Sequence, residues 1–188
     1  FEALGSPDFE RRGAVTDEWI TIFKQLWSHS PASFDGKFYK YTDIRCEPFP
    51  LQKPHPPIWV GGHSKAALRR TARHGDGWHP VGAIAASPLP PQEMRAHLQT
   101  LKQMTEAEGR DFSKLTISYK APLYDTSVPD RDGSRRSFSG TPDEIAGDIR
   151  SFAAIGVHEL IFDFRGNSID ASVAGLQRFA AEVIPLVN

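Results

Sequence analysis

Two glycines followed by a histidine and a serine form the first segment of this sequence that could bind a ligand. The segment comprises Gly61, Gly62, His63 and Ser64, and it follows the short apolar run 57–60. This pattern predicts a strand that turns into a helix capped by Ser64. Backbone N–H groups at a helix N-terminus attract anions, and glycine lets the backbone approach a phosphate closely. A phosphate site and a plain serine-capped turn both fit, since the segment matches neither a dinucleotide-binding glycine motif nor a Walker loop.

A second candidate lies in segment 75–80, whose sequence is GDGWHP. His79 is expected at the C-terminal end of a short strand, which is where parallel α/β folds bind their ligands. Asp76 between two glycines is typical of a turn, and Trp78 is typical of a core. A lone histidine is more often structural than catalytic, so both interpretations of His79 stay open.

Polar side chains also follow two later apolar segments. Tyr119 and Lys120 stand near the end of the third predicted strand, and Asp163 and Arg165 stand at the end of the fourth. We expect the ligand-binding face to expose Tyr119, Lys120 and Arg165, with solvated surface groups as the alternative. Asp163 is expected either to point into the sheet's enclosed face or to cap the segment that follows.

Several classes of site are not indicated by the residue types present. The sequence holds neither an HExxH motif nor a Cys/His cluster, so no metal site is predicted. A GxSxG nucleophile elbow is missing as well. The single cysteine, Cys46, has no partner for an internal disulfide and is interpreted as structural. Such cysteine usage fits a reducing compartment, and we expect a cytoplasmic location.

The composition indicates one globular domain with a core of its own. The 188 residues are 39% hydrophobic and 24% charged, and the formal net charge is -1. A net charge this close to zero does not indicate binding to nucleic acid or to an anionic membrane surface. No segment approaches the roughly 20 apolar residues of a membrane span, and no signal peptide is expected. Neither a nucleic acid nor a membrane is therefore expected as a partner.

The hydrophobic periodicity predicts four strand–helix units, and hence an α/β fold with a parallel sheet. The clearest local signal is the capping box of Thr141 and Glu144. Periodicity alone fits both half of a (β/α)₈ barrel and a small doubly wound sheet. The predicted strands are 57–60, 77–81, 115–121 and 160–162. The predicted helices run from Ser64 to His74, from Pro90 or Pro91 to Gly109, from Thr141 to Gly156, and through 173–183.

The chain is interpreted as a single partial barrel domain, 1–188, in which 57–188 form the four βα units. Residues 1–56 are expected to form a helical and extended insertion region. Within it, Thr16 is predicted to cap a helix, and a short hairpin is predicted around residues 35–36. The polar segment 122–139 is expected to be a lid, a binding loop or disordered.

Taken together, these segments resemble the luciferase-like monooxygenase family, and in particular its bacterial branch that uses the deazaflavin coenzyme F-420. The most specific matches are PPIWVGGHS at 56–64 and GDGWHP at 75–80. The resemblance rests on the order and spacing of many short segments. They are residues 1–5, 10–13, 16–18, 26–27, 34–39, 56–64, 67–70, 75–80, 140–144 and 156–157.

The resemblance implies a (β/α)₈ TIM barrel, of which this chain matches only the C-terminal half, with a cofactor at the C-terminal face of the strands. It implies that Gly61, Gly62, His63 and Ser64 hold the cofactor phosphate, and that Trp78 and His79 approach its ring. The implied cofactor is coenzyme F-420 or FMN, and the implied activity is that of a flavin-type oxidoreductase or monooxygenase that acts on a small-molecule organic substrate. The family's first four strands have no counterpart here, so no catalytic acid or base can be assigned.

Two other hypotheses remain beside this one. The chain begins at Phe1 and matches half of a barrel, so it is alternatively a truncated, catalytically inactive fragment that self-associates. The strand edges at 58–60 and 160–162 would then pair with a second copy, and a homo-oligomer is expected. A phosphate-binding barrel enzyme of unrelated chemistry is the third hypothesis.

Overall fold

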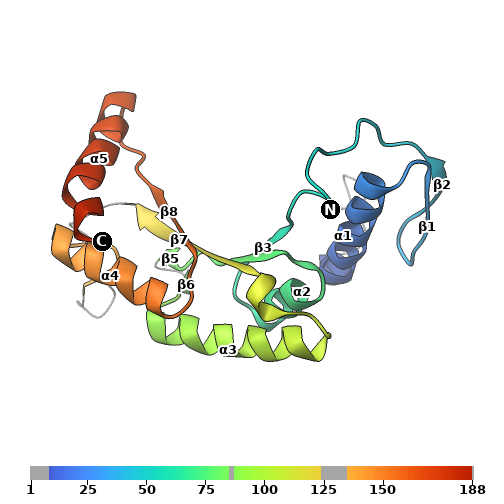
Figure 1. Ribbon diagram of the computed structural model, residues 1–188, viewed down its shortest axis with the longest axis horizontal. Helices are drawn as coiled ribbons and strands as arrows, with labels where there is room; N and C mark the ends of the chain where they lie inside the picture. The colour runs from blue at the N-terminus through green and yellow to red at the C-terminus, as the bar shows by residue number, and fades with distance from the viewer. Residues whose placement is uncertain (1–8, 85–86, 124–134, 188) are drawn as a thin grey trace.

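The computed structural model describes residues 9–84, 87–123 and 135–187, and its centre is a parallel sheet of four strands in the order β3-β4-β7-β8. The alternation of four strands with four helices confirms the predicted α/β architecture (Figure 1). The strands are β3 (Trp59–Gly61), β4 (Gly77–His79), β7 (Thr116–Leu123) and β8 (Glu159–Asp163). The helices that follow them are α2 (Lys65–His74), α3 (Pro91–Ala107), α4 (Pro142–Ala154) and α5 (Ile169–Glu182).

The starts of these helices follow the predicted capping residues. Ser64 adopts an extended backbone and its hydroxyl accepts a hydrogen bond from the Ala67 N–H at 3.2 Å, which confirms the predicted cap of α2. Thr141 and Glu144 form the predicted capping box at the start of α4. The last helix begins earlier than expected, because Ser168 provides a further cap through its bond from the Ala171 N–H.

The N-terminal part folds as a helix packed beside a hairpin. It comprises η2 (Phe9–Arg11), α1 (Arg12–Ser28) and the antiparallel strands β1 (Ala32–Asp35) and β2 (Lys40–Ile44). The hairpin confirms the predicted turn near residues 35–36. The predicted cap at Thr16 is wrong, because α1 already includes the residues before it and the Thr16 hydroxyl bonds the Arg12 carbonyl within the helix. Glu18 instead accepts hydrogen bonds from the N–H groups of Lys37, Phe38 and Tyr39 at the hairpin turn.

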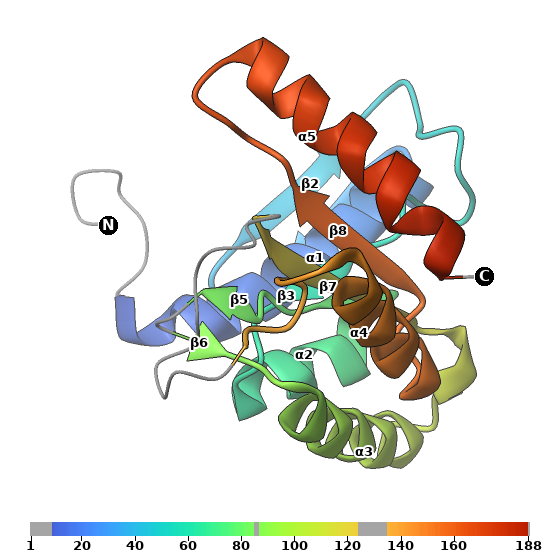
Figure 2. The same ribbon diagram turned by 90° about the vertical axis from the view of Figure 1, so that its left-hand side faces the viewer.

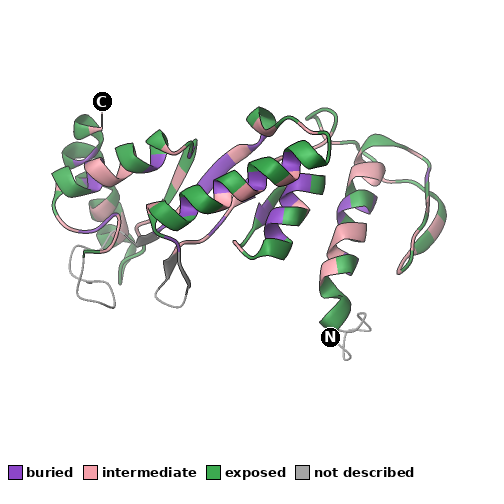
Figure 3. Cartoon of the chain, turned by 90° about the horizontal axis from the view of Figure 1, so that it is seen from below, coloured by how far each residue is buried: buried purple, intermediate pink, exposed green. Residues whose placement is uncertain are grey.

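One face of the sheet is covered by α2, α3 and α4, and the main core lies between them (Figures 1 and 2). Figure 3 shows this buried layer along the strands and the inner sides of the helices. Because side chains alternate along a strand, every second residue of each strand enters this layer. Val60 of β3 is buried. The buried strand residues of the main core are Trp78, Ile117, Tyr119 and Ala121, and they pack with Leu68, Ala72, Met94, Leu98, Leu101 and Phe152 from the helices.

The expectation that Tyr119 is exposed is wrong. It shares the phase of Ile117 on β7, so its ring enters the core, where it is 2% exposed and its hydroxyl donates to the Leu89 carbonyl. Burial raises the pKa of Tyr119 far above its usual range. Lys120, in the opposite phase, is only partly buried, as expected of a residue on the other face.

The opposite face of the sheet, which we call the open face, is formed by the alternate strand residues. Its exposed side chains include Trp59, which is 36% exposed, and Ile161, which is 41% exposed. Strand pairing brings the residues of this face into rows across the sheet. The open-face residues are Trp59, Gly61, Gly77, His79, Thr116, Ser118, Lys120, Glu159, Ile161 and Asp163.

Smaller elements complete the described chain. They are the two-residue strands β5 (Ala83–Ile84) and β6 (Ser87–Pro88), which pair with each other, and the 3₁₀ turns η3 (Phe112–Lys114) and η4 (Ile184–Leu186). The middle of the predicted loop 122–139, residues 124–134, lies outside the described residues. At its end, Phe138 is fully buried, and Arg135 pairs with Asp148 of α4 at 2.7 Å. In the described part of the chain, no helix has the length and apolarity needed to cross a bilayer.

Candidate functional site

The turn between β3 and α2 is a glycine-rich segment that lies at the surface. Gly61, Gly62 and Ser64 are all exposed. Gly62 has a φ of +84°, a conformation that L side chains rarely adopt, which explains the glycine at this position. A Cβ on Gly62 would lie 3.7 Å from the nearest atom, the Cβ of Ala67. The turn therefore leaves open space beside the backbone at the start of the helix.

The first turn of α2 presents backbone donors next to this space. The Ala67 N–H bonds the Ser64 hydroxyl oxygen, and the Leu68 N–H bonds the Ser64 carbonyl. The N–H groups of Lys65 and Ala66 precede the first intrahelical donor, the Leu68 N–H, so the helix itself provides no acceptor for them, as at every helix start. The Ser64 hydroxyl accepts one bond and keeps its own proton as a donor. These groups and the positive end of the helix dipole suit an oxyanion.

Trp78 supports this turn from the covered face of the sheet. Its side chain is fully buried, and its indole N–H donates to the Gly62 carbonyl at 2.7 Å. Because Trp78 and His79 are consecutive on β4, their side chains point to opposite faces. Of these two predicted ring contacts, only His79 lies on the open face.

His79 occupies the centre of a row on the open face. It pairs in register with Gly61 of β3 at one side, and its Nδ1 lies 3.0 Å from the Ser118 hydroxyl of β7 at the other. The Trp59 ring lies beside it, with ring centroids 6.0 Å apart. Burial, assisted by the charge of Lys120 and opposed by Glu159, lowers the pKa of His79 below the ordinary histidine value. The imidazole is therefore mainly neutral at pH 7.

His63 lies on the other side of the turn, toward α3. Its ring meets the His97 ring edge-on at 5.7 Å, and the His97 ring lies 6.3 Å from that of Trp78. Burial, together with His63, lowers the pKa of His97, while Glu93 raises it. The structure thus brings all six predicted site residues to the carboxyl ends of β3 and β4, where Gly61, Gly62, His63 and Ser64 form the turn, Trp78 lies on the covered face and His79 lies on the open face.

The other polar residues expected near a ligand lie farther along the sheet. Lys120 follows Ser118 on the open face of β7. Arg165 is exposed and pairs with both carboxylate oxygens of Asp163, and this pairing lowers the pKa of Asp163. Asp163 also accepts a hydrogen bond from the Arg165 N–H at 3.2 Å, so it caps the segment that follows β8, which is the second of its two predicted roles, whereas Ser168 caps α5.

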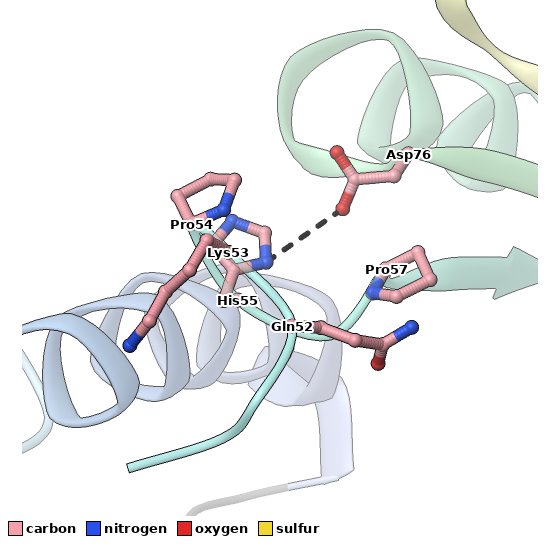
Figure 4. Close-up of a pocket in the computed structure, with 6 residues that line it drawn as sticks. All are labelled: Gln52, Lys53, Pro54, His55, Pro57 and Asp76. Carbon is pink, nitrogen blue, oxygen red and sulfur yellow. Dashed lines mark ion pairs between the residues drawn. The ribbon is translucent and has the colours of Figure 1, made fainter.

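A hollow of about 390 Å³ lies at the opposite edge of the sheet (Figure 4). The His55 and Asp76 side chains face each other across it, with 4.0 Å between His55 Nδ1 and Asp76 Oδ2. Asp76 also accepts a hydrogen bond from the Ile58 N–H, so it fixes the chain just before β3. This hollow adjoins the amino ends of β3 and β4, whereas ligands in parallel α/β folds bind at the carboxyl ends. It is lined by Gln52, Lys53, Pro54, His55, Pro57 and Asp76.

Sequence reasoning missed three residues that surround the predicted site: Trp59, His97 and Ser118. Ser118 alternates with the apolar residues of β7, and this period indicates its face but not its neighbour on β4. His97 stands three residues after Met94 on α3, beside the apolar stripe of that helix. Trp59 covers Gly77, where a Cβ would lie 2.7 Å from the indole. Among the described residues, no group of three or more His, Cys, Asp or Glu side chains is placed to hold a metal ion.

Comparison with known sequences gives one matching family model, described as luciferase-like monooxygenase, over residues 1–127. An FMNH(2)-dependent dimethylsulfone monooxygenase of Pseudomonas putida is 26% identical, over 100% of this chain and 62% of its own length. An uncharacterized protein of Mycobacterium tuberculosis is 36% identical, over 58% of this chain and 35% of its own length. The chain thus spans less than two thirds of these relatives.

Similar solved structures share the fold at low sequence identity. An F-420-dependent secondary alcohol dehydrogenase, solved with an F-420-acetone adduct, has a TM-score of 0.72 at 15% identity. This chain covers 64% of it, with 97% of its own residues aligned. A monooxygenase from Streptomyces bottropensis has a TM-score of 0.74 at 19% identity, with 95% of this chain and 62% of the other covered. Such neighbours are TIM-barrel enzymes, so the four βα units correspond to part of a barrel.

Proposed function

Since this chain belongs to the luciferase-like monooxygenase family, we propose that it forms part of a flavin- or deazaflavin-dependent oxidoreductase. The proposed cofactor is FMN or coenzyme F-420, and the proposed substrate is a small organic molecule. Relatives with both kinds of cofactor support this choice, since one is named as FMNH(2)-dependent and another as F-420-dependent. When bound, such a cofactor supplies hydride transfer or oxygen activation, while the protein orients it and excludes water.

The observation that carries the proposal is the open turn at the start of α2. Its exposed glycines leave room for a phosphate, and the Ser64 hydroxyl and the N–H groups of Lys65 and Ala66 are suitable donors to it. His63 is proposed to contact the phosphate from the side of α3. The residues present therefore fit the phosphate end of either cofactor.

The remaining predicted residues receive distinct roles. His79 is proposed to approach the cofactor ring from the open face, because it lies one strand away from the turn and in register with Gly61. Trp78 is proposed to hold the turn in place through the Gly62 carbonyl rather than to contact the ring. In this proposal residues 57–188 supply the four βα units, and residues 1–56 form an insertion region of the same domain.

Replacing Ser64 by alanine tests the phosphate site. The variant loses the helix cap, which costs about 1 kcal/mol of stability. It also loses a donor to a charged oxygen, worth about 1.5–3 kcal/mol, so we expect the dissociation constants of FMN and coenzyme F-420 to rise about tenfold or more. Each cofactor is titrated separately, and its binding is followed by fluorescence anisotropy.

Thr141→Ala is the matched control, because Thr141 caps α4 in the same way as Ser64 caps α2. It is expected to lose similar stability and to keep the affinity for the cofactor. If the two variants bound the cofactor with equal affinity, Ser64 would not be part of the phosphate site. Binding of neither cofactor by the unaltered protein would contradict the proposed function itself.

The second candidate is a catalytically inactive chain that associates with itself. It is favoured by the position of β3 and β8 as the outer strands of the described sheet and by the exposed Ile161 on β8. Light scattering tests this candidate over a range of protein concentrations. A monomer at every concentration would count against edge-to-edge association.

A further inference from the structure

Ser118 is a buried hydroxyl on a face whose other side chains are at least partly exposed. It is 0% exposed, whereas its neighbours on the same face of β7, Thr116 and Lys120, are both partly exposed. Within the described parts of the chain, the Ser118 hydroxyl makes a single hydrogen bond, to His79 Nδ1 at 3.0 Å. Burying a hydroxyl is unfavourable unless it is paired, so this bond accounts for a serine at the position.

The direction of this bond follows from the number of available partners. A hydroxyl carries one proton, and a buried donor left without an acceptor is costly. Since His79 Nδ1 is its partner among the described residues, the Ser118 hydroxyl donates to it. A ring nitrogen that accepts carries no proton, so the proton of the neutral imidazole resides on Nε2.

The surroundings of His79 favour the same neutral ring. Burial and the charge of Lys120 on β7 lower the pKa of His79, and Glu159 on β8 opposes them only in part. Trp59 on β3 lies beside the ring, and Gly61 is its partner in register. The ring is thus bounded by Trp59 on one strand and bonded to Ser118 on the next.

We propose that Ser118 is a positioning residue, which holds His79 as the Nε2–H tautomer so that His79 donates a hydrogen bond to a carbonyl oxygen or ring nitrogen of the bound cofactor. The ligand in this inference rests on the proposed function, whereas the tautomer depends on the protein alone. Ser118 does not touch the cofactor; it acts through His79. Loss of its hydroxyl frees both ring nitrogens to compete for the proton.

Long-range ¹H–¹⁵N NMR of labelled protein measures this tautomer directly, and His79→Gln identifies the resonances. In the unaltered protein we expect the Nε2–H form and a pKa below the ordinary histidine value. In Ser118→Ala we expect a mixture of tautomers and a higher pKa of His79, because the lost donor had stabilised the neutral ring. Thr116→Ala, on the same face of the same strand, is expected to leave both properties unchanged.

The outcomes separate the inference from the proposed function. Two results would overturn the role of Ser118. One is an Nδ1–H tautomer of His79 in the unaltered protein. The other is an unchanged Nε2–H tautomer in a Ser118→Ala variant whose circular dichroism spectrum matches that of the unaltered protein. In a second arm, saturation with FMN or coenzyme F-420 is expected to shift the His79 Nε2 resonance. An unshifted resonance despite cofactor binding, seen by anisotropy, would overturn the cofactor contact. Failure of both cofactors to bind would contradict the proposed function, while the tautomer would still decide the role of Ser118.

Discussion

Replacing Trp78 by alanine is expected to lower the free energy of unfolding by about 3–5 kcal/mol, the usual cost of a cavity left by a large aromatic side chain. Trp78 is fully buried between the sheet and the helices. The same variant is expected to bind cofactor more weakly, because the indole N–H that holds the Gly62 carbonyl is lost. Urea unfolding measures the first effect, and cofactor titration of the folded protein measures the second.

Phe152→Ala is the matched control for this variant. Phe152 is equally buried but packs against Tyr119 and Phe138, away from the turn. It is expected to cost similar stability and to leave the affinity for the cofactor unchanged. If both variants lost affinity equally, the effect of Trp78 would reflect general loosening of the core. A further variant, Trp78→Phe, keeps most of the apolar volume and removes the N–H, so it isolates the hydrogen bond to Gly62.

Gly62→Val is expected to reduce cofactor affinity by about tenfold or more, corresponding to at least about 1.4 kcal/mol. A β-branched residue at a φ of +84° is strained, and the turn can relieve that strain only by moving. Such a movement displaces the donors at the start of α2 from the phosphate, and the valine side chain also occupies the space beside them. The measurement is again a titration with FMN and with coenzyme F-420.

Gly109→Val is the control variant, because it introduces similar backbone strain at a position away from the proposed phosphate site. Gly109 also has a positive φ, of 70°, and a Cβ added there would meet no atom within 4 Å. It follows α3 at the far end of that helix. Both valine variants are expected to lose stability, but only Gly62→Val should lose affinity. An unchanged dissociation constant in Gly62→Val would show that the turn does not hold the phosphate.

Much of the local structure could be predicted because it depends on residues close together in the chain. Ser64 and Thr141 satisfy backbone groups three residues ahead, and this geometry is the same in any helix. The alternation along 115–121 likewise assigns each side chain to one of two faces. Thr16 is the exception, since a threonine inside a helix can bond the carbonyl four residues back as readily as it can cap.

The alternation does not determine which of the two faces meets a ligand. Tyr119 stands near the end of a strand, and for that reason it is among the side chains expected to be exposed. Yet it shares a face with Ile117, and three helices cover that face. The burial of Phe138 likewise escapes prediction, because it follows a polar segment whose composition resembles a solvated loop. Its ring nevertheless lies against Tyr119 and Phe152 in the core.

The sequence by itself determined the order of strands and helices, the caps of α2 and α4, and the position of the glycine-rich turn. It also determined the family, because many short segments occur in the right order. Only the tertiary structure decided that Trp78 reaches the Gly62 carbonyl and that Ser118 meets His79. These partners are 16 and 39 residues apart, and the second pair belongs to different strands whose register is set by sheet pairing. A local pattern fixes the face on which a side chain lies, whereas contact with a distant residue depends on how the strands and helices pack.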